Sequence, residues 1–432
     1  MKRMALEKLL AWRDSPRRKP LILEGARQVG KTWLVKEFAK RAFADFAMVD
    51  FEDHRELRNM FESDFDVRRI ISSLGIATGK KIEPGRTLLF LDEIQHAPRG
   101  VTALKYIREK LPELHVVAAG SLLGVALHKG ESFPVGNVDF LRLFPMSFSE
   151  FLVATGDGQL AKSVVEKDWE TIRPFENILV DRLKSYLFVG GMPEAVDVFV
   201  KTGDCRAVRA VHATLAMSYG NDFSKHIPPI LLSRVRMVWD GLAGQLAKEN
   251  RKFKYADLKK GGRAKDFEEA IEWLVAAGLA YKVARVGKPG IPISAYEDRS
   301  AFKLFCLDVG LMAAMAGLRA ETILEGNRLF EEFKGSLTEQ YVLQQLVSQE
   351  PDGIAYWTND RSTAEVDFLV QTQDRVVPIE VKSGENLRAK SFKLFCETYK
   401  PEKAFRASLA FYRNQGWMEN LPLWALVTNA FF

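Results

Sequence analysis

Short apolar runs alternate with amphipathic stretches along residues 20–145. The apolar runs predict strands at residues 21–24, 46–51, 87–91, 116–119 and 139–144. Helical spacing of apolar positions separates several of them, for example at residues 33–43 and 101–110. Strands that alternate with helices predict a parallel sheet with helices on both faces.

The pattern becomes mainly helical after residue 145. Ser147 and Glu150 have the spacing of a capping box and predict the start of a helix. We expect a helical subdomain over residues 151–228. Farther along, helical patterns at 231–247 and 265–277 precede two short strands at 279–283 and 302–306. Helices followed by a hairpin favour a winged-helix-like arrangement for residues 229–318.

The last part of the chain returns to alternating elements. A long helix is predicted near residues 328–348, followed by strands at 354–357, 365–371 and 376–382 and a helix near 389–398. The final strand is expected at residues 407–412. This pattern indicates a separate α/β unit over residues 319–432.

Composition limits the class of protein. Apolar residues make up 47% of the chain and charged residues 27%, which is typical of globular proteins. Its length of 432 residues favours more than one domain. No apolar segment has the length of a membrane span, and the first residues have no signal-peptide core. We therefore expect a cytoplasmic location and no membrane partner. Three scattered cysteines argue against a disulfide framework or a Cys/His metal site.

Residues 25–32 match the phosphate-binding P-loop pattern in full. The loop consists of Gly25, Ala26, Arg27, Gln28, Val29, Gly30, Lys31 and Thr32. The glycines allow backbone N–H groups to face the phosphates, the lysine reaches the β- and γ-phosphates, and the threonine hydroxyl binds Mg²⁺. A strand precedes the loop and a helix follows it, so the sequence predicts a site for ATP and Mg²⁺.

A second motif lies at the end of the strand predicted at 87–91. Asp92 is placed to hold Mg²⁺ through water, and Glu93 to orient the attacking water molecule. The next strand is followed by Ser121, which is a candidate contact to the γ-phosphate. A serine at a strand end is also common in ordinary loops.

These motifs resemble those of the AAA-type ATPases of bacteria and archaea that carry an uncharacterised C-terminal domain. The shared features include Gly-x-Arg-Gln-Val-Gly-Lys-Thr, Leu-Phe-Leu-Asp-Glu-Ile-Gln, Phe-Pro-Met-Ser-Phe-Ser-Glu-Phe, Gly-Gly-Met-Pro-Glu-Ala and Asp-Val-Gly-Leu. The resemblance implies an AAA-like fold, binding of ATP and Mg²⁺, and a sensor-like role for Ser121. It assigns no arginine finger, because the stretch after the sensor strand departs from the family pattern. Arg99 and Arg142 are candidates, with ordinary surface charge as the alternative.

A basic cluster lies in the middle of the chain. Eight basic and two acidic residues fall between Lys248 and Lys265, in a chain of net charge +6. If the winged-helix-like arrangement forms, this cluster lies near the element that would meet DNA phosphates. The alternative is a solvated charged face.

Carboxylates near the C-terminus form a second candidate site. Glu380 and Lys382 share a strand face, and a tight hairpin through residues 371–375 would bring Asp367 beside them. Glu339 lies on the apolar face of the preceding helix. The set resembles the PD-(D/E)xK nuclease superfamily, in which the acids bind Mg²⁺ and the lysine acts on water. The alternative is an ordinary half-buried strand with a polar outer face.

Together these patterns predict an α/β protein in four parts. We expect a P-loop NTPase core of the AAA type at residues 1–150, a helical subdomain at 151–228, a winged-helix-like region at 229–318 and a restriction-endonuclease-like α/β domain at 319–432. One hypothesis is an Mg²⁺-dependent ATPase that acts on or with nucleic acid, with an active or degenerate nuclease module. The other is an ATP-controlled switch whose C-terminal domain binds a protein partner and cuts nothing.

Overall fold

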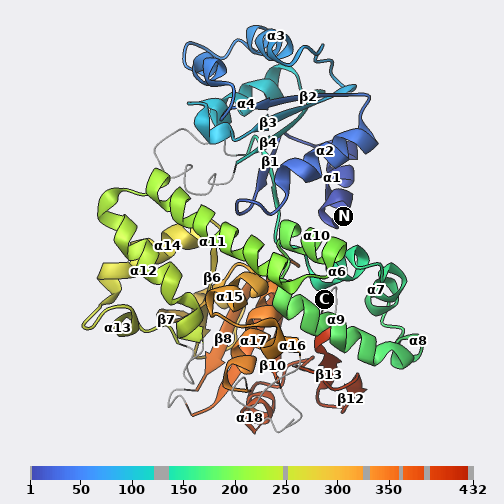
Figure 1. Cartoon of the computed structure of the whole chain (residues 1–432), viewed down its shortest axis with the longest axis vertical. Helices are drawn as coiled ribbons and strands as arrows, with labels where there is room; N and C mark the ends of the chain where they lie inside the picture. The colour runs from blue at the N-terminus through green and yellow to red at the C-terminus, as the bar shows by residue number, and fades with distance from the viewer. Residues whose placement is uncertain are drawn as a thin grey trace. The chain divides into compact units, whose positions relative to one another are not determined.

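The structure is a computed structural model, and it describes residues 2–120, 136–246, 252–324, 331–359, 363–383 and 390–426. The chain forms two compact units. The first comprises Lys2–Phe144 with Ala276–Gly278, and the second comprises Pro145–Val275 with Leu279–Phe432. In Figure 1 the first unit is mainly blue and cyan, and the second runs from green to red.

The first unit contains a five-stranded parallel sheet. Its strands are β1 (Leu21–Glu24), β2 (Asp45–Asp50), β3 (Thr87–Asp92), β4 (His115–Ala119) and β5 (Asp139–Arg142). They lie in the order β2-β3-β4-β1-β5. Every residue of β3 is buried, as is usual for a central strand of a parallel sheet. The five predicted strands are confirmed, with boundaries that differ by two residues at most.

Helices pack on both faces of this sheet. The helices of the unit are α1 (Ala5–Asp14), α2 (Lys31–Ala42), α3 (Val67–Thr78) and α4 (Gly100–Lys110), with short 3₁₀ turns at Arg55–Phe61 and Ile94–His96. One apolar core joins Leu89 and Leu91 of β3 to Ile70 of α3 and Leu104 of α4. Helix α2 packs against β2, β3 and β4. The fold is therefore a parallel α/β sheet of the P-loop NTPase kind, as predicted.

The second unit begins with helices. They are α6 (Phe148–Ala154), α7 (Gly158–Val165), α8 (Trp169–Ile172), α9 (Glu176–Val189), α10 (Pro193–Thr202) and α11 (Cys205–His226). The capping box at the start of α6 is confirmed, because Ser147 accepts the Glu150 N–H and the Glu150 carboxylate accepts the Ser147 N–H. The middle region follows as α12 (Pro229–Leu246), α13 (Tyr255–Leu258), α14 (Ala264–Ala276), β6 (Ala280–Val286), β7 (Glu297–Cys306), α15 (Val309–Met315) and α16 (Ala320–Leu324).

The C-terminal elements differ from the prediction at their end. They are α17 (Glu331–Val347), β8 (Gly353–Thr358), β9 (Glu365–Thr372), β10 (Arg375–Val381), α18 (Lys390–Tyr399), β11 (Phe405–Ser408), β12 (Arg413–Asn414) and β13 (Glu419–Pro422). The final strand predicted at 407–412 is wrong in position. The Asn420 side-chain amide donates to the carbonyls of Ala410 and Phe411. These carbonyls are thus taken by a side chain, and β11 ends before them.

One mixed sheet of eight strands organises the second unit, in the order β12-β13-β11-β10-β9-β8-β6-β7. Strand β6 pairs in parallel with β8, with Ala284 opposite Ala355. The β6–β7 hairpin of the middle region therefore belongs to the same sheet as the C-terminal strands. The sequence did not predict this shared sheet. The division into domains at residues 228 and 318 stays a prediction.

Candidate functional site

The P-loop connects β1 to α2 in a conformation that requires glycine. Gly25 has φ +146°, and a Cβ atom there would lie 2.4 Å from the Leu143 carbonyl oxygen. Gly30 has φ +94° and precedes the first residue of α2. Residues with a Cβ atom rarely adopt these backbone angles. The loop therefore requires glycine at these two positions to take this conformation. The helix that follows points its N-terminus at the loop, as anion sites require.

Lys31 is held inside this loop. Its ammonium donates to the carbonyls of Gly25 at 2.8 Å and Ala26 at 2.9 Å, and the residue is 7% exposed. Burial lowers the pKa of Lys31 to about 8, although the carboxylates of Glu93 and Asp92 oppose this change. The hydrogen bonds of this buried ammonium go to neutral carbonyls, so its positive charge is available to a phosphate anion. The residue is therefore suited to bind phosphate.

The Thr32 hydroxyl and the Asp92 carboxylate meet at the end of β3. Thr32 Oγ1 donates to Asp92 Oδ2 across 2.7 Å, and Asp92 Oδ1 accepts the Glu93 N–H at 3.1 Å. Burial raises the pKa of Asp92, which is 4% exposed. A hydroxyl and a carboxylate oxygen at this separation are the ligand types that Mg²⁺ prefers, and the site fits that ion.

Glu93 directly follows β3 in the left-handed backbone region, with φ +49°. A non-glycine residue in this region is strained, and such strain is common at functional sites. The Gln95 side-chain amide donates to Glu93 Oε2 and fixes the direction of its carboxylate. Gln95 was not predicted as a site residue, although its position two residues after Glu93 in the same motif was a usable signal.

Arg3 also supports the P-loop and had no sequence signal. Its guanidinium donates to the carbonyl of Val29 at 2.9 Å and to that of Phe144 at 2.6 Å. The residue is 4% exposed, although it lies close to the start of the chain. Arg3 thereby ties the loop to the segment that follows β5.

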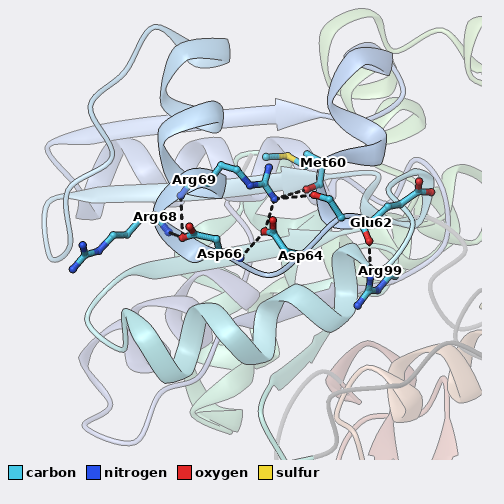
Figure 2. Close-up of polar contacts among 8 residues, drawn as sticks. Met60, Glu62, Asp64, Asp66, Arg68, Arg69 and Arg99 are labelled. Carbon is cyan, nitrogen blue, oxygen red and sulfur yellow. Dashed lines mark hydrogen bonds and ion pairs between the residues drawn. The ribbon is translucent and has the colours of Figure 1, made fainter.

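The arginine-finger candidates make local contacts. Arg99 donates to the Glu62 carbonyl at 2.7 Å and stacks on the Phe65 ring at 4.3 Å. Figure 2 shows the hydrogen bond from Arg99 to Glu62 beside Arg69, whose guanidinium donates to the Met60 carbonyl and the Asp64 carboxylate. Both arginines stabilise the loop before α3. Arg142 forms an ion pair with Glu24 at 3.7 Å. Ser121 lies outside the described residues.

The C-terminal hairpin brings Asp367, Glu380 and Lys382 together. The β9–β10 register continues to place Asp367 opposite Glu380, and Asp367 Oδ2 accepts the Val381 N–H at 2.7 Å. Lys382 Nζ donates to Glu380 Oε1 at 2.6 Å. Burial raises the pKa of Glu380 to about 7, and the nearby Asp367 carboxylate adds to this effect. The predicted convergence of these residues agrees with the geometry, because the turn is short.

Glu339 has a different partner. Its carboxylate lies 3.5 Å from Lys303 Nζ, and the same ammonium donates to Glu365 Oε1 at 2.6 Å. Lys303 comes from β7 and was not predicted. Within the described ranges, no group of three or more His, Cys, Asp or Glu side chains is arranged to hold a metal ion. The structure shows Glu339 paired with Lys303, and the role of Glu339, Asp367 and Glu380 as metal ligands stays a prediction.

The basic cluster is only partly within the described chain, because Lys248 and Arg251 lie outside it. Its exposed members are Lys254, Lys259, Lys260, Arg263 and Lys265, around α13 and the start of α14. Phe253 is buried against Phe302, and its N–H donates to the Phe302 carbonyl. An exposed run of cations beside a short helix suits phosphate contact and solvation equally.

No helix in the described part of the chain combines the length and apolarity that crossing a membrane requires.

Comparison with known protein families gives the clearest description for the first unit. Residues 17–152 match the model of an AAA domain. Residues 180–322 match a domain of unknown function (DUF8612), and residues 334–424 match another domain of unknown function (DUF4143). No curated protein matches the chain.

Several solved structures resemble the chain at low sequence identity. The Walker-type ATPase PABY2304 of Pyrococcus abyssi is 15% identical with a TM-score of 0.45, over 73% of this chain and 95% of that chain. The Aeropyrum pernix ORC1 protein in complex with DNA is 13% identical with a TM-score of 0.31, over 72% and 90%. The Thermotoga maritima RuvB Holliday junction branch migration motor is 15% identical with a TM-score of 0.32, over 65% and 89%. At these values none of the three carries an argument about function.

The domain match agrees with the parallel sheet and with the P-loop geometry. Residues 17–152 therefore have the features of an AAA-type P-loop ATPase domain.

Proposed function

We propose that the chain is an Mg²⁺-dependent ATPase that acts on or with nucleic acid through a nuclease-like C-terminal module. The observation that carries the ATPase part is the hydrogen bond of Thr32 to Asp92, beside the buried ammonium of Lys31. It joins the two motifs across 60 residues of sequence. Both motifs therefore serve one site.

Each residue has a distinct role in ATP hydrolysis. Lys31 would bind the β- and γ-phosphates in exchange for its carbonyl partners, and Thr32 and Asp92 would hold Mg²⁺. The bound ion would neutralise charge on the phosphates. Glu93 orients the attacking water, with its carboxylate held by Gln95. We also assign Ser121 a contact to the γ-phosphate.

Two features support the nucleic-acid part. The chain order α17-β8-β9-β10-α18-β11 sets Asp367, Glu380 and Lys382 at one place on the sheet, in the residue types used for metal-assisted phosphodiester hydrolysis. The succession α12, α13, α14 and the β6–β7 hairpin supports a winged-helix-like region, with exposed Lys259 and Lys260 beside it. We propose Glu339, Asp367 and Glu380 as metal ligands, and Lys382 as the residue that acts on water.

A second candidate is an ATP-controlled switch with a catalytically silent C-terminal module. The specific observation in its favour is that Glu339 is already paired with Lys303. A carboxylate that is neutralised by the protein does not require a metal ion.

Binding to mixed-sequence duplex DNA across a salt series separates the two candidates. An ATPase that works with nucleic acid should bind at low salt and lose affinity steeply as salt rises, because phosphate contacts release counterions. ATP hydrolysis in the same samples monitors the first unit. Hydrolysis without any DNA or RNA binding at low salt would support the switch instead. Absence of ATP binding would contradict both candidates.

A further inference from the structure

A buried ammonium lies among the carboxylates of the second unit. Lys303 of β7 is 0% exposed. Its Nζ donates to Glu365 Oε1 of β9 at 2.6 Å and lies 3.5 Å from Glu339 Oε2 of α17. The ring of Tyr356 on β8 lies 5.0 Å from the same nitrogen. Segments separated by 36 and 62 residues of sequence thus converge on one cation.

Burial of this lysine requires its partners. A charged group leaves water only at a large cost unless opposite charge and hydrogen bonds compensate for it. Glu339 is itself 2% exposed, so it needs a cation as much as Lys303 needs an anion. The aromatic face of Tyr356 adds a smaller attraction for the ammonium. The arrangement therefore stabilises a buried positive charge at this position.

Two buried hydroxyl groups belong to residues of β8 that neighbour this site. Among the described residues, neither the Tyr356 hydroxyl nor Thr358 Oγ1 has a hydrogen-bond partner, and both residues are at least 98% buried. Cross-strand pairing places Thr358 opposite Glu365, so their side chains share a sheet face. Buried polar atoms usually have partners. These hydroxyls offer hydrogen bonds to a ligand that keeps part of its water shell, as divalent ions do.

The remaining carboxylates of the face also have partners from the protein. Asp367 accepts the Val381 N–H, and Glu380 accepts from Lys382. Lys303 contacts neither of these two acids, so its direct electrostatic effect falls on Glu339 and Glu365.

We propose that Lys303 is a tethered cation that compensates the charge of Glu339 in place of a divalent metal ion, with Glu365 as its second partner. The site is metal-free as long as Lys303 stays there, and metal binding requires its displacement. This inference rests on the proposed function for the role of Glu339 as a potential metal ligand. It adds that a residue from the β6–β7 hairpin, outside the nuclease-like motif, controls whether metal enters.

The test measures thermal unfolding of the full chain without nucleotide, with and without Mn²⁺. Lys303→Met should lower the melting temperature by on the order of 10 °C, because a buried carboxylate loses its cation. Mn²⁺ should recover most of this loss, since it binds only the folded site. The double variant Lys303→Met/Glu339→Gln should recover stability without metal and lose the response to Mn²⁺.

Lys282→Met is the matched control. Lys282 lies on the neighbouring strand β6 and pairs with Glu272 at 2.7 Å, near the surface. Wild-type protein and this variant should show the same small response to Mn²⁺. Any binding at the P-loop is common to all four proteins and cancels in the comparison.

Three outcomes would overturn the proposal. The first is a rise in melting temperature with Mn²⁺ in the wild type that equals the rise in Lys303→Met. The second is a folded Lys303→Met protein that does not respond to Mn²⁺. The third is a Lys303→Met protein that fails to fold at any Mn²⁺ concentration while the double variant folds, because the pair is then purely structural. A lack of DNA binding or cleavage would contradict the proposed function but leave these melting curves unaffected.

Discussion

The Asp308 carboxylate accepts a hydrogen bond from the backbone N–H of Gly191 across 2.6 Å. The two residues belong to separate motifs, 117 residues apart in sequence. Gln344 of α17 donates to the same oxygen at 3.0 Å. One buried carboxylate thereby joins the end of α9, the start of α15 and the helix that carries Glu339. These two motifs therefore stabilise the packing of the helices in the second unit.

Substitution of Gly190 should disrupt this junction. Gly190 has φ +72°, and a Cβ atom would lie 2.1 Å from Asp308 Oδ1. Gly190→Ala should lower the free energy of unfolding by about 2–4 kcal/mol, because it combines backbone strain with overpacking. Urea denaturation measures the change. Gly158→Ala is the control, since a Cβ atom there meets nothing within 4 Å. Equal stability of the two variants would contradict this account.

Lys31→Ala should weaken ATP binding by on the order of 10- to 100-fold, because it removes a charge-assisted contact to the phosphates. Isothermal titration calorimetry measures the affinity. Lys36→Ala on the exposed side of α2 removes a lysine from the same helix and should leave the affinity unchanged. An unaltered affinity in Lys31→Ala would mean that ATP does not bind at this loop.

Glu93→Gln should retain ATP affinity and lose hydrolysis by about 10²- to 10⁴-fold, since the carboxylate acts on water and not on the nucleotide. The glutamine is nearly the same size, so the fold should persist. Phosphate release at saturating ATP measures the loss, and calorimetry checks that binding remains. Turnover at the wild-type rate would remove Glu93 from the mechanism.

Lys259→Glu/Lys260→Glu should weaken DNA binding similarly for all sequences, because phosphate contacts carry no base information. If both lysines contact phosphates, the slope of log affinity against log salt should fall by about 2. Fluorescence anisotropy over a salt series measures this slope. Lys162→Glu/Lys201→Glu changes the net charge equally at exposed positions of α7 and α10. A similar loss in this control would indicate a general charge effect.

His212 should make stability depend on pH. Arg209 donates to Nδ1 at 2.9 Å, so the imidazole is neutral there, and Nε2 donates to the Val189 carbonyl at 3.0 Å. Burial, with the Arg209 charge, lowers the pKa of His212 to about 4. Between pH 6.5 and 4 the unfolded chain binds a proton that the folded chain does not. The contribution of neutral His212 to the free energy of unfolding is therefore complete above pH 6.5 and is lost as the pH falls towards 4.

Neutral His212 contributes about 3 kcal/mol to the free energy of unfolding above pH 6.5. Urea unfolding of wild type and His212→Gln at pH 4.5, 5.5 and 6.5 measures it. The variant should be less stable at pH 6.5, with a weaker dependence on pH. His115 in the first unit, whose pKa burial also lowers to about 4, should keep its own pH dependence in both proteins. A parallel pH dependence in the two proteins would contradict the role of His212.

The sequence by itself determined those strands and motifs that depend on residues close together in the chain. The parallel strands of the first unit followed from short apolar runs, and the P-loop followed from a contiguous pattern that includes Gly25 and Lys31. Asp367 and Glu380 could be brought together in advance because a two-residue turn separates their strands. In each case, spacing along the chain fixes spacing in the fold.

The tertiary structure alone decided the contacts between distant segments. Hydrophobic periodicity shows that β6 is a strand, but it does not reveal that β8 is its neighbour. It does not predict that Arg3 donates a hydrogen bond to the P-loop, or that Lys303 forms an ion pair with Glu339. Buried charges depend on which partners the packed chain brings within reach, and many lysines and glutamates in the sequence could have filled those roles. The electrostatic character of the C-terminal site is therefore a property of the folded sheet.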